Sequence, residues 1–326
     1  MSETTTQVRE RATGDADLLR AMLEIRFFED HCHELFAAGL LRGATHLGQG
    51  QEAVSVGFCR ALGEGDTMTC TYRGHAATLA MGAPIDRAFG EMLGRQGGLC
   101  DGKGGSMHLT DVSVGALGAF GVVGAHLPIS VGAAFAAKYR RSGAVNVCFF
   151  GDGATNIGAF HESLNFASIM KLPLIFVCEN NLYGEYSPLA KTTPIERLAD
   201  RAASYGMHGE RIDGNEVQEV LETARRLVSR AREGGGPALV EAMTYRQKGH
   251  ARSDPGAYRP PGELEEWLER DPLTLLEARM LSSGSTREEL ESLRTQVKEE
   301  VDAALARAQS WPEPPAGARF EDVLAA

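Results

Sequence analysis

Apolar residues of this chain follow two patterns, short continuous runs and longer stretches with helical spacing. The continuous runs are rich in Val, Phe, Leu and Ile, as in strands that are covered on both faces. They are residues 145–150, 172–178 and 238–243. The stretches with apolar residues three or four positions apart are residues 17–40, 127–139, 157–167 and 217–231. Strands that alternate with amphipathic helices predict an α/β fold, a parallel sheet flanked by helices.

The same pattern places nearly all of the chain in one folded unit. Residues 1–15 are polar and carry no apolar run, which predicts a flexible tail rather than a secretory signal. Residues 16–326 are expected to form a single α/β domain, because domains of this class reach that size. Beyond Pro260 the chain becomes acidic and its apolar spacing helical, so a C-terminal helical extension is predicted from about residue 262 to residue 326.

Composition and charge argue against several classes of function. The formal net charge of the 326 residues is −11 and no basic block occurs, so a nucleic-acid partner is not expected. No stretch has the length and apolarity of a membrane span. The six cysteines form no C-x-x-C pair, and two of them lie inside predicted core strands. Buried reduced thiols of this kind are typical of a cytoplasmic protein.

The strand at residues 145–150 leads into Gly151-Asp152-Gly153. Glycines let a ligand approach the backbone closely, whereas a carboxylate repels a phosphate unless a divalent cation lies between them. Mg²⁺ suits this position because it prefers oxygen ligands and binds one or two carboxylates together with phosphates. Asn180-Asn181 follows the next strand, 26 residues beyond Gly153, and parallel strands end at one edge of a sheet. Considered alone, Gly-Asp-Gly is explained as well by a plain tight turn.

Polar loops elsewhere supply further candidates. Tyr72 and Arg73 follow a short strand, where an arginine fork suits diphosphate oxygens, although the segment taken alone favours an ordinary ion-pairing arginine. His46 lies among glycines before a helix and is either a proton donor or a capping residue. His250 lies in the polar loop after residues 238–243. It is a catalytic or phosphate-binding residue or, as the loop alone favours, a plain loop residue.

Two nucleotide-binding motifs are approached but not completed. Gly97, Gly102 and Lys103 have the spacing of a P-loop, yet Gly104 replaces the Ser or Thr whose hydroxyl would bind Mg²⁺. The dinucleotide fingerprint also fails, because Asn156 stands where its third glycine belongs. These departures argue against a nucleoside triphosphatase and against a nicotinamide-dependent oxidoreductase.

The motifs occur together in the order of one known family. Gly-Asp-Gly, followed after 26 residues by Asn-Asn, resembles the thiamine-diphosphate motif of diphosphate-binding domains. Further matching segments are residues 72–75, 102–108, 121–125, 178–184 and 244–250. From about residue 17 to the C-terminus the chain resembles the α subunit of pyruvate-type 2-oxo acid and acetoin dehydrogenases, the first component of such complexes. The resemblance implies the thiamine-diphosphate-binding fold.

The resemblance also implies a role for each matching position. The ligands of Mg²⁺ would be Asp152, the Asn181 side chain and the Tyr183 backbone oxygen. The diphosphate of thiamine diphosphate would be held by Tyr72, Arg73, Gly153, Ala154 and His250. The aminopyrimidine ring would meet the backbone of Gly121 and Val123. His46 matches a histidine near the substrate, and His250 is placed to assist proton transfer as well.

An enzyme of this type cleaves pyruvate by oxidative decarboxylation, or cleaves acetoin, and transfers the acyl group to a lipoyl group on an acyltransferase component. In two-chain members a β subunit supplies the glutamate that activates the pyrimidine. This sequence offers no convincing substitute, since Glu52 lies in a helix-start pattern. The chain is therefore expected to contribute half of an active site in an α₂β₂ heterotetramer. Pyruvate, acetoin and another 2-oxo substrate stay open, and a catalytically silent diphosphate-domain scaffold is the rival function.

Overall fold

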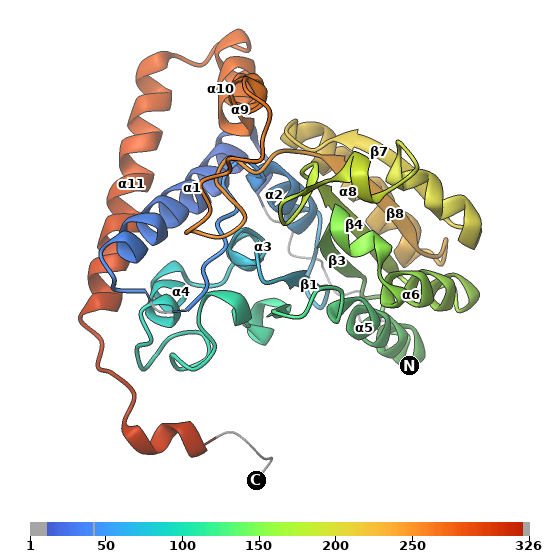
Figure 1. Ribbon diagram of the computed structural model, residues 1–326, viewed down its shortest axis with the longest axis horizontal. Coiled ribbons are helices and arrows are strands. Elements are labelled where there is room, and N and C mark those ends of the chain that lie inside the picture. Colours follow the sequence, from blue (N-terminus) through green and yellow to red (C-terminus); the bar gives the residue numbers. More distant parts are fainter. Residues whose placement is uncertain (1–11, 42, 322–326) are drawn as a thin grey trace, which may run out of the picture.

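A six-stranded parallel sheet forms the centre of the molecule, in the order β2-β1-β3-β4-β8-β7 (Figure 1). The structure is a computed structural model that describes residues 12–41 and 43–321. Helices cover both faces of the sheet, so the predicted α/β fold is confirmed. Most of the predicted tail at residues 1–15 lies outside the described residues.

The strands of the sheet are β1 Thr67–Thr71, β2 Ala116–Phe120, β3 Asn146–Gly151, β4 Leu174–Asn180, β7 His208–Asp213 and β8 Ala238–Met243. The two outermost strands, β2 and β7, were not among the predicted ones. Their sequences, Ala-Leu-Gly-Ala-Phe and His-Gly-Glu-Arg-Ile-Asp, lack the run of branched apolar residues that identifies a strand buried on both faces. Each pairs with a neighbour on one side only, which explains the weaker signal.

The helices are α1 Asp15–Ala37, α2 Glu52–Arg60, α3 His75–Ala80, α4 Ile85–Met92, α5 His126–Arg140, α6 Gly158–Ile169, α7 Leu189–Thr192, α8 Val217–Arg232, α9 Glu263–Leu268, α10 Pro272–Ser282 and α11 Arg287–Gln309. None of these described helices is long and apolar enough to cross a membrane. The pattern-based helices at residues 17–40, 127–139 and 217–231 match α1, α5 and α8 to within three residues at each end.

Alternate side chains of the central strands β3, β4 and β8 point into two separate hydrophobic cores. In β3, Val147 and Phe149 pack with α1, α2, α3 and α8, whereas Cys148 and Phe150 pack with α5 and α6. All four side chains are at most 1 % exposed. A strand with apolar residues at both alternating positions needs cover on both faces, which is why its sequence is a continuous apolar run.

The C-terminal helices extend the larger of the two cores. Val297, Val301 and Ala304 of α11 are buried against this core, and α11 runs beside α1 at one side of the molecule (Figure 1). Its first turn is closed by a capping box, in which Thr286 and Glu289 exchange side chain-to-backbone hydrogen bonds. The extension is thus packed on the body through its own apolar face.

The carboxyl ends of β1, β3, β4 and β8 lie side by side at one edge of the sheet, because adjacent strands are parallel and in register. Two helices follow β3. A short 3-10 helix, Asp152–Asn156, comes first, and α6 begins at Gly158, within two residues of the predicted stretch 157–167 at each end. Asp152 therefore heads a 3-10 turn and not the helix itself.

Candidate functional site

A cavity of about 320 Å³ opens at this edge of the sheet. Segments that follow β1, β3, β4 and β8 converge on it, as ligand sites in parallel sheets commonly do. Of the residues singled out from the sequence, those that line it are Tyr72, Arg73, Val123, Asp152, Gly153, Ala154, Asn181, Tyr183 and His250. Two residues of that set, His46 and Gly121, are not among the lining residues.

Asp152 occupies the end of the cavity formed by β3 and β4. Its side chain is 1 % exposed, and Oδ2 has no hydrogen-bond partner within the described residues. Burial raises the pKa of Asp152 to about 6, against the lowering effect of the backbone N–H groups of Asp152 and Gly153. An unpartnered buried carboxylate oxygen is costly unless a cation completes it. Asn181 and Tyr183 line the same cavity, so oxygen groups that could share a metal with Asp152 come together here.

Backbone strain is concentrated directly beside these groups. Leu182 and Glu185 have φ angles of +73° and +56°, in the left-handed region that such residues rarely adopt. Leu182 is held there by a hydrogen bond from its N–H to Asn180 Oδ1, at 3.1 Å. Glu185 lies in the turn of the small hairpin of β5 Tyr183–Gly184 and β6 Ser187–Pro188, and Leu182 directly precedes this hairpin. Strain of this kind persists only where the surroundings fix it, and it accumulates at functional sites.

Two arginines, Arg73 and Arg246, also line the cavity. Arg73 is anchored by hydrogen bonds to the carbonyl oxygens of Leu47 and His250, the second at 2.9 Å. Arg246 is 2 % exposed and donates to the Glu185 carbonyl at 3.0 Å. Burial, followed by the neighbouring Arg246, lowers the pKa of Arg73 to about 10, so its guanidinium group stays charged at neutral pH. A buried and a half-buried arginine that line one cavity are suited to an anionic ligand.

His46, Tyr72 and His250 form a cluster of rings beside the arginines. The ring centre of His46 lies 4.4 Å from that of Tyr72 and 5.0 Å from that of His250. Burial and then Arg73 lower the pKa of His46 to about 3 and that of His250 to about 4. Both imidazoles are therefore neutral at pH 7 in the protein alone. Each has a buried Nδ1 without a partner within the described residues, and a neutral imidazole can accept or donate a proton there.

The segment expected to meet the pyrimidine ring is only partly enclosed. Val123 lines the cavity but is 46 % exposed, and its neighbour Val122 is 71 % exposed. Gly121 lies against His108: a Cβ on Gly121 would come within 3.2 Å of His108 Cε1. This end of the cavity therefore opens onto the surface of the chain, whereas the Asp152 end is closed.

Comparison with known proteins gives the family of the chain. A model of the dehydrogenase E1 component matches residues 20–317. The α subunit of acetoin:2,6-dichlorophenolindophenol oxidoreductase from Bacillus subtilis is 43 % identical over 94 % of this chain and 92 % of that protein. The α subunit of the pyruvate dehydrogenase E1 component from Rhizobium meliloti is 39 % identical over 95 % of this chain and 90 % of that protein.

The chain belongs to the dehydrogenase E1 component family. Enzymes of this family depend on thiamine diphosphate, which confirms the resemblance drawn from the motifs. The cavity of this E1 chain fits the diphosphate and its Mg²⁺: Asp152, whose buried Oδ2 has no partner within the described residues, lines it together with Asn181 and Tyr183, and Arg73 and Arg246 supply positive charge. Gly153 is also in a tight place, since a Cβ there would lie 3.1 Å from the Gly184 Cα.

Sequence reasoning missed three polar residues that line the cavity of the E1 chain: Gln51, Glu179 and Arg246. Glu179 directly precedes the Asn-Asn pair and Arg246 follows β8, so their positions after predicted strands carried a usable signal. Burial raises the pKa of Glu179 to about 7, against the lowering effect of Arg73. Gln51 comes from a loop before α2, and its sequence position gives no hint that it reaches β4.

Proposed function

We propose that this chain acts with a β subunit as an E1 component that cleaves pyruvate or acetoin and passes the acyl group to a lipoyl carrier. The observation that supports this most strongly is the presence of an unsatisfied acidic group and two arginines in one cavity. Asp152, which has an unpartnered oxygen, lines the cavity together with Arg73 and Arg246. A diphosphate that carries Mg²⁺ presents both of the charges that these groups complement. The relatives' names, which include pyruvate and acetoin, give the substrate class.

In this proposal, separate groups of residues bind Mg²⁺, the diphosphate and the pyrimidine ring of the cofactor. Asp152, the Asn181 side chain and the Tyr183 backbone oxygen bind Mg²⁺. The diphosphate is held by Tyr72, Arg73, Gly153, Ala154 and His250. Gly121 and Val123 support the pyrimidine ring. The bound cofactor supplies the electron sink for the bond cleavage.

His46 and His250 are the groups that we assign to proton transfer at the substrate. Both are neutral at pH 7, and a negative substrate or diphosphate would raise the pKa of each toward the working range. The ring of Tyr186 lies 5.9 Å from that of His250 and adds an aromatic wall to this side. A small acyl substrate between these rings would be kept from bulk water.

Two observations support a β subunit as the partner. Both carboxylate oxygens of Glu52 are engaged, Oε1 with Arg26 and Oε2 with the Gly50 N–H, so Glu52 is not available to activate the pyrimidine. The Val122–Val123 side of the cavity is exposed, where a second chain could close it. We propose an α₂β₂ heterotetramer that works with a lipoyl-bearing acyltransferase. The six cysteines in thiol form fit a cytoplasmic location.

The test is dye reduction by the chain reconstituted with its β subunit, thiamine diphosphate and Mg²⁺. The panel contains pyruvate, acetoin, 2-oxobutyrate and a branched 2-oxo acid, with Asp152→Ala as the inactive control. Turnover of pyruvate or acetoin that the control loses is the expected result. Cofactor binding without turnover of any substrate would support a scaffold instead, and binding of a nicotinamide cofactor in place of thiamine diphosphate would overturn the proposal.

A further inference from the structure

Gln51 joins the loop before α2 to the proposed metal ligand Asn181. Its Oε1 accepts a hydrogen bond from Asn181 Nδ2 at 2.9 Å, although the two residues are 130 positions apart. Both side chains are buried, Gln51 to 3 % and Asn181 to 6 % exposure, and both line the cavity. None of the roles proposed above involves Gln51.

The orientation of both amides follows from one backbone group. The Tyr183 N–H donates to Asn181 Oδ1 at 3.3 Å, and a backbone N–H can only donate. The oxygen of Asn181 is therefore at the Tyr183 side, and its NH₂ group is at the Gln51 side. Gln51 must in turn present its own oxygen to that NH₂ group. The oxygen of Asn181 has two lone pairs, and the Tyr183 N–H occupies one of them. The other lone pair is left for a metal.

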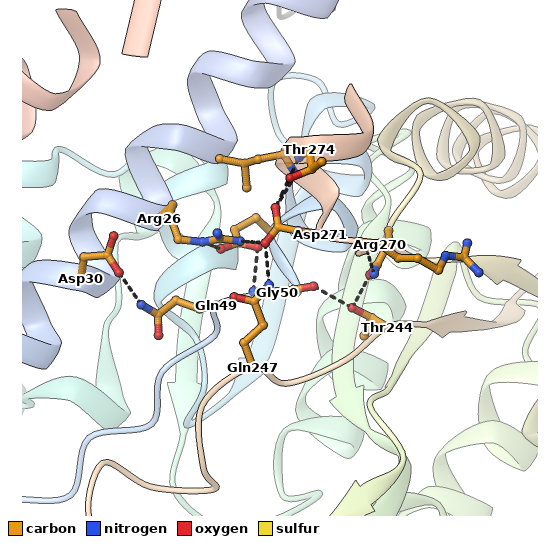
Figure 2. A network of polar contacts seen from close by, with 12 residues as sticks. Arg26, Asp30, Gln49, Gly50, Thr244, Gln247, Arg270, Asp271 and Thr274 are labelled. Atoms are coloured by element: carbon orange, nitrogen blue, oxygen red, sulfur yellow. Dashed lines mark hydrogen bonds and ion pairs between the residues drawn. The ribbon is translucent and has the colours of Figure 1, made fainter. Parts of the chain in front are cut away.

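The segment that carries Gln51 is fixed by a buried polar network (Figure 2). The Gly50 N–H donates to Glu52 Oε2 at 2.9 Å, and the Gly50 carbonyl accepts from Thr244 Oγ1 at 3.0 Å. Arg26 links Glu52 to Asp271, the N-terminal cap of α10. Glu52 is fully buried and Asp271 is 7 % exposed. The network thus connects α1, α2, the loop after β8 and the C-terminal extension around Gln51.

A second contact holds the same loop from the other side. Glu29, fully buried in α1, accepts the Gly48 N–H through Oε1 at 2.8 Å and contacts His75 Nδ1 through Oε2 at 3.0 Å. The backbone before Gln51 is therefore tied to buried carboxylates at two positions, Gly48 and Gly50. A side chain on such a fixed backbone loses little conformational freedom when it orients another group.

We propose that Gln51 is a positioning residue that orients Asn181 for Mg²⁺, with the Arg26–Glu52–Asp271 network holding Gln51 in place. This inference rests on the proposed function, because it assigns a metal to Asp152 and Asn181. It predicts that the loop before α2 determines metal affinity without touching the metal. Removal of a hydrogen bond to a metal ligand commonly weakens metal binding by about 10- to 100-fold.

The experiment measures Mn²⁺, a paramagnetic substitute for Mg²⁺, by electron paramagnetic resonance of the free ion. The α₂β₂ protein is titrated in the presence of thiamine diphosphate. We expect Gln51→Met, which keeps the length of the side chain but removes the acceptor, to raise the Mn²⁺ dissociation constant about 10- to 100-fold. Gln51→Glu keeps an acceptor oxygen and should bind Mn²⁺ at least as tightly as the unaltered protein.

Gln49→Met is the matched control. Gln49 lies two residues away, and its Nε2 donates to Asp30 at 2.6 Å and not to a residue of the cavity. The Mn²⁺ affinity of the Gln49→Met protein should stay within about threefold of that of the unaltered protein, because Gln49 does not contact a proposed metal ligand. Thermal unfolding of each cofactor-free variant shows whether the fold is retained.

The outcomes separate the two proposals. If the unaltered heterotetramer does not bind Mn²⁺ with thiamine diphosphate, the proposed function fails. If it binds the ion and Gln51→Met binds it equally well, only the positioning role of Gln51 is wrong. Equal weakening in Gln51→Met and Gln51→Glu would also overturn that role, because it would indicate a direct contact through the lost NH₂ group.

Discussion

The wall of the cavity and four buried glutamates of the surrounding scaffold differ in how their polar atoms are satisfied. Among the residues that line the cavity, Asp152 Oδ2, His250 Nδ1 and Arg246 Nε are buried and have no partner within the described residues. In the scaffold, each carboxylate oxygen of four buried glutamates has at least one partner. These glutamates are Glu29, Glu52, Glu91 and Glu241.

Glu91 shows the second behaviour most fully. Its Oε2 accepts the N–H groups of Cys100 and Gly102, and its Oε1 accepts those of Gly104 and Gly105, at 2.7 to 2.9 Å. One carboxylate therefore shapes the glycine-rich loop that resembled a P-loop in the sequence. Satisfied buried charge builds the scaffold, and unsatisfied buried charge marks where a ligand must complete it.

The variant Asp152→Asn tests most directly whether the unpartnered groups of the wall serve ligand binding rather than stability. We expect Mg²⁺-dependent thiamine diphosphate binding by the heterotetramer to weaken at least about 100-fold, because a charged metal ligand is lost. The free energy of unfolding of the cofactor-free protein should stay equal or rise, because an unpartnered buried charge is removed. Isothermal calorimetry and urea unfolding measure the two quantities. A clear loss of stability would contradict the division between wall and scaffold.

Glu91→Gln should have the opposite profile. The amide places an NH₂ group against N–H donors that the carboxylate accepted, so the free energy of unfolding should fall by roughly 2–4 kcal/mol. Urea unfolding of the α₂β₂ protein gives the number. Glu162→Gln, at an exposed position of α6, is the matched control and should change it by less than about 0.5 kcal/mol. Equal changes in the free energy of unfolding of the two variants would show that the four hydrogen bonds of Glu91 do not stabilise the fold.

The same comparison shows how far the sequence alone predicts this protein. The parallel sheet, the bounds of α1, α5, α6 and α8, and the placement of Asp152 and Asn181 at one edge of the sheet follow from local patterns, since continuous apolar runs and the Gly-Asp-Gly turn are contained in short segments. The wall was therefore largely predictable. The edge strands β2 and β7 were not, because half-covered strands lose the apolar run.

The scaffold behind the wall could not be predicted, for a physical reason. Arg26 forms ion pairs with both Glu52 and Asp271. Gln51 is hydrogen-bonded to Asn181, and Glu91 is hydrogen-bonded to the loop that begins at Cys100. These contacts form only because the fold brings the segments together. A lone glutamate or glutamine in a helix or loop looks like a solvated residue from its neighbours in sequence. Such pairings depend on tertiary distance, which the hydrophobic pattern does not contain.

Gly50→Ala tests the scaffold at a crowded backbone position next to Gln51. Gly50 has a φ of +95°, and a Cβ would lie 2.5 Å from the Tyr245 carbonyl oxygen. We expect the free energy of unfolding to fall by about 1–3 kcal/mol. Gly65→Ala is a matched control with a φ of +84° and open space around its Cβ, so it retains the backbone strain without the clash. If both variants lose the same stability, the close approach to Tyr245 contributes nothing.

The smallest effect, a pH dependence, concerns the wall alone. Burial raises the pKa of Asp152 to about 6 from its ordinary value of 3.8. Folding without a cofactor therefore favours the protonated form, and this stability is fully present below pH 3.8 and is lost as the pH rises through 6. Metal binding needs the carboxylate, so Mg²⁺ affinity should have the opposite dependence. It should fall about tenfold per pH unit below pH 6 and level off above the titrating range.

Glu179 is the group that has to be separated from Asp152 in this measurement, since burial raises its pKa to about 7 in the same cavity. Glu179→Gln removes this titration and leaves Asp152 in place. Calorimetric Mg²⁺ titrations from pH 5 to pH 8 should then show a single inflection near pH 6. An inflection that disappears together with Glu179 would assign the metal-linked proton to Glu179. Asp152 would then be ionised over the whole range from pH 5 to pH 8, and metal binding would not displace a proton from it.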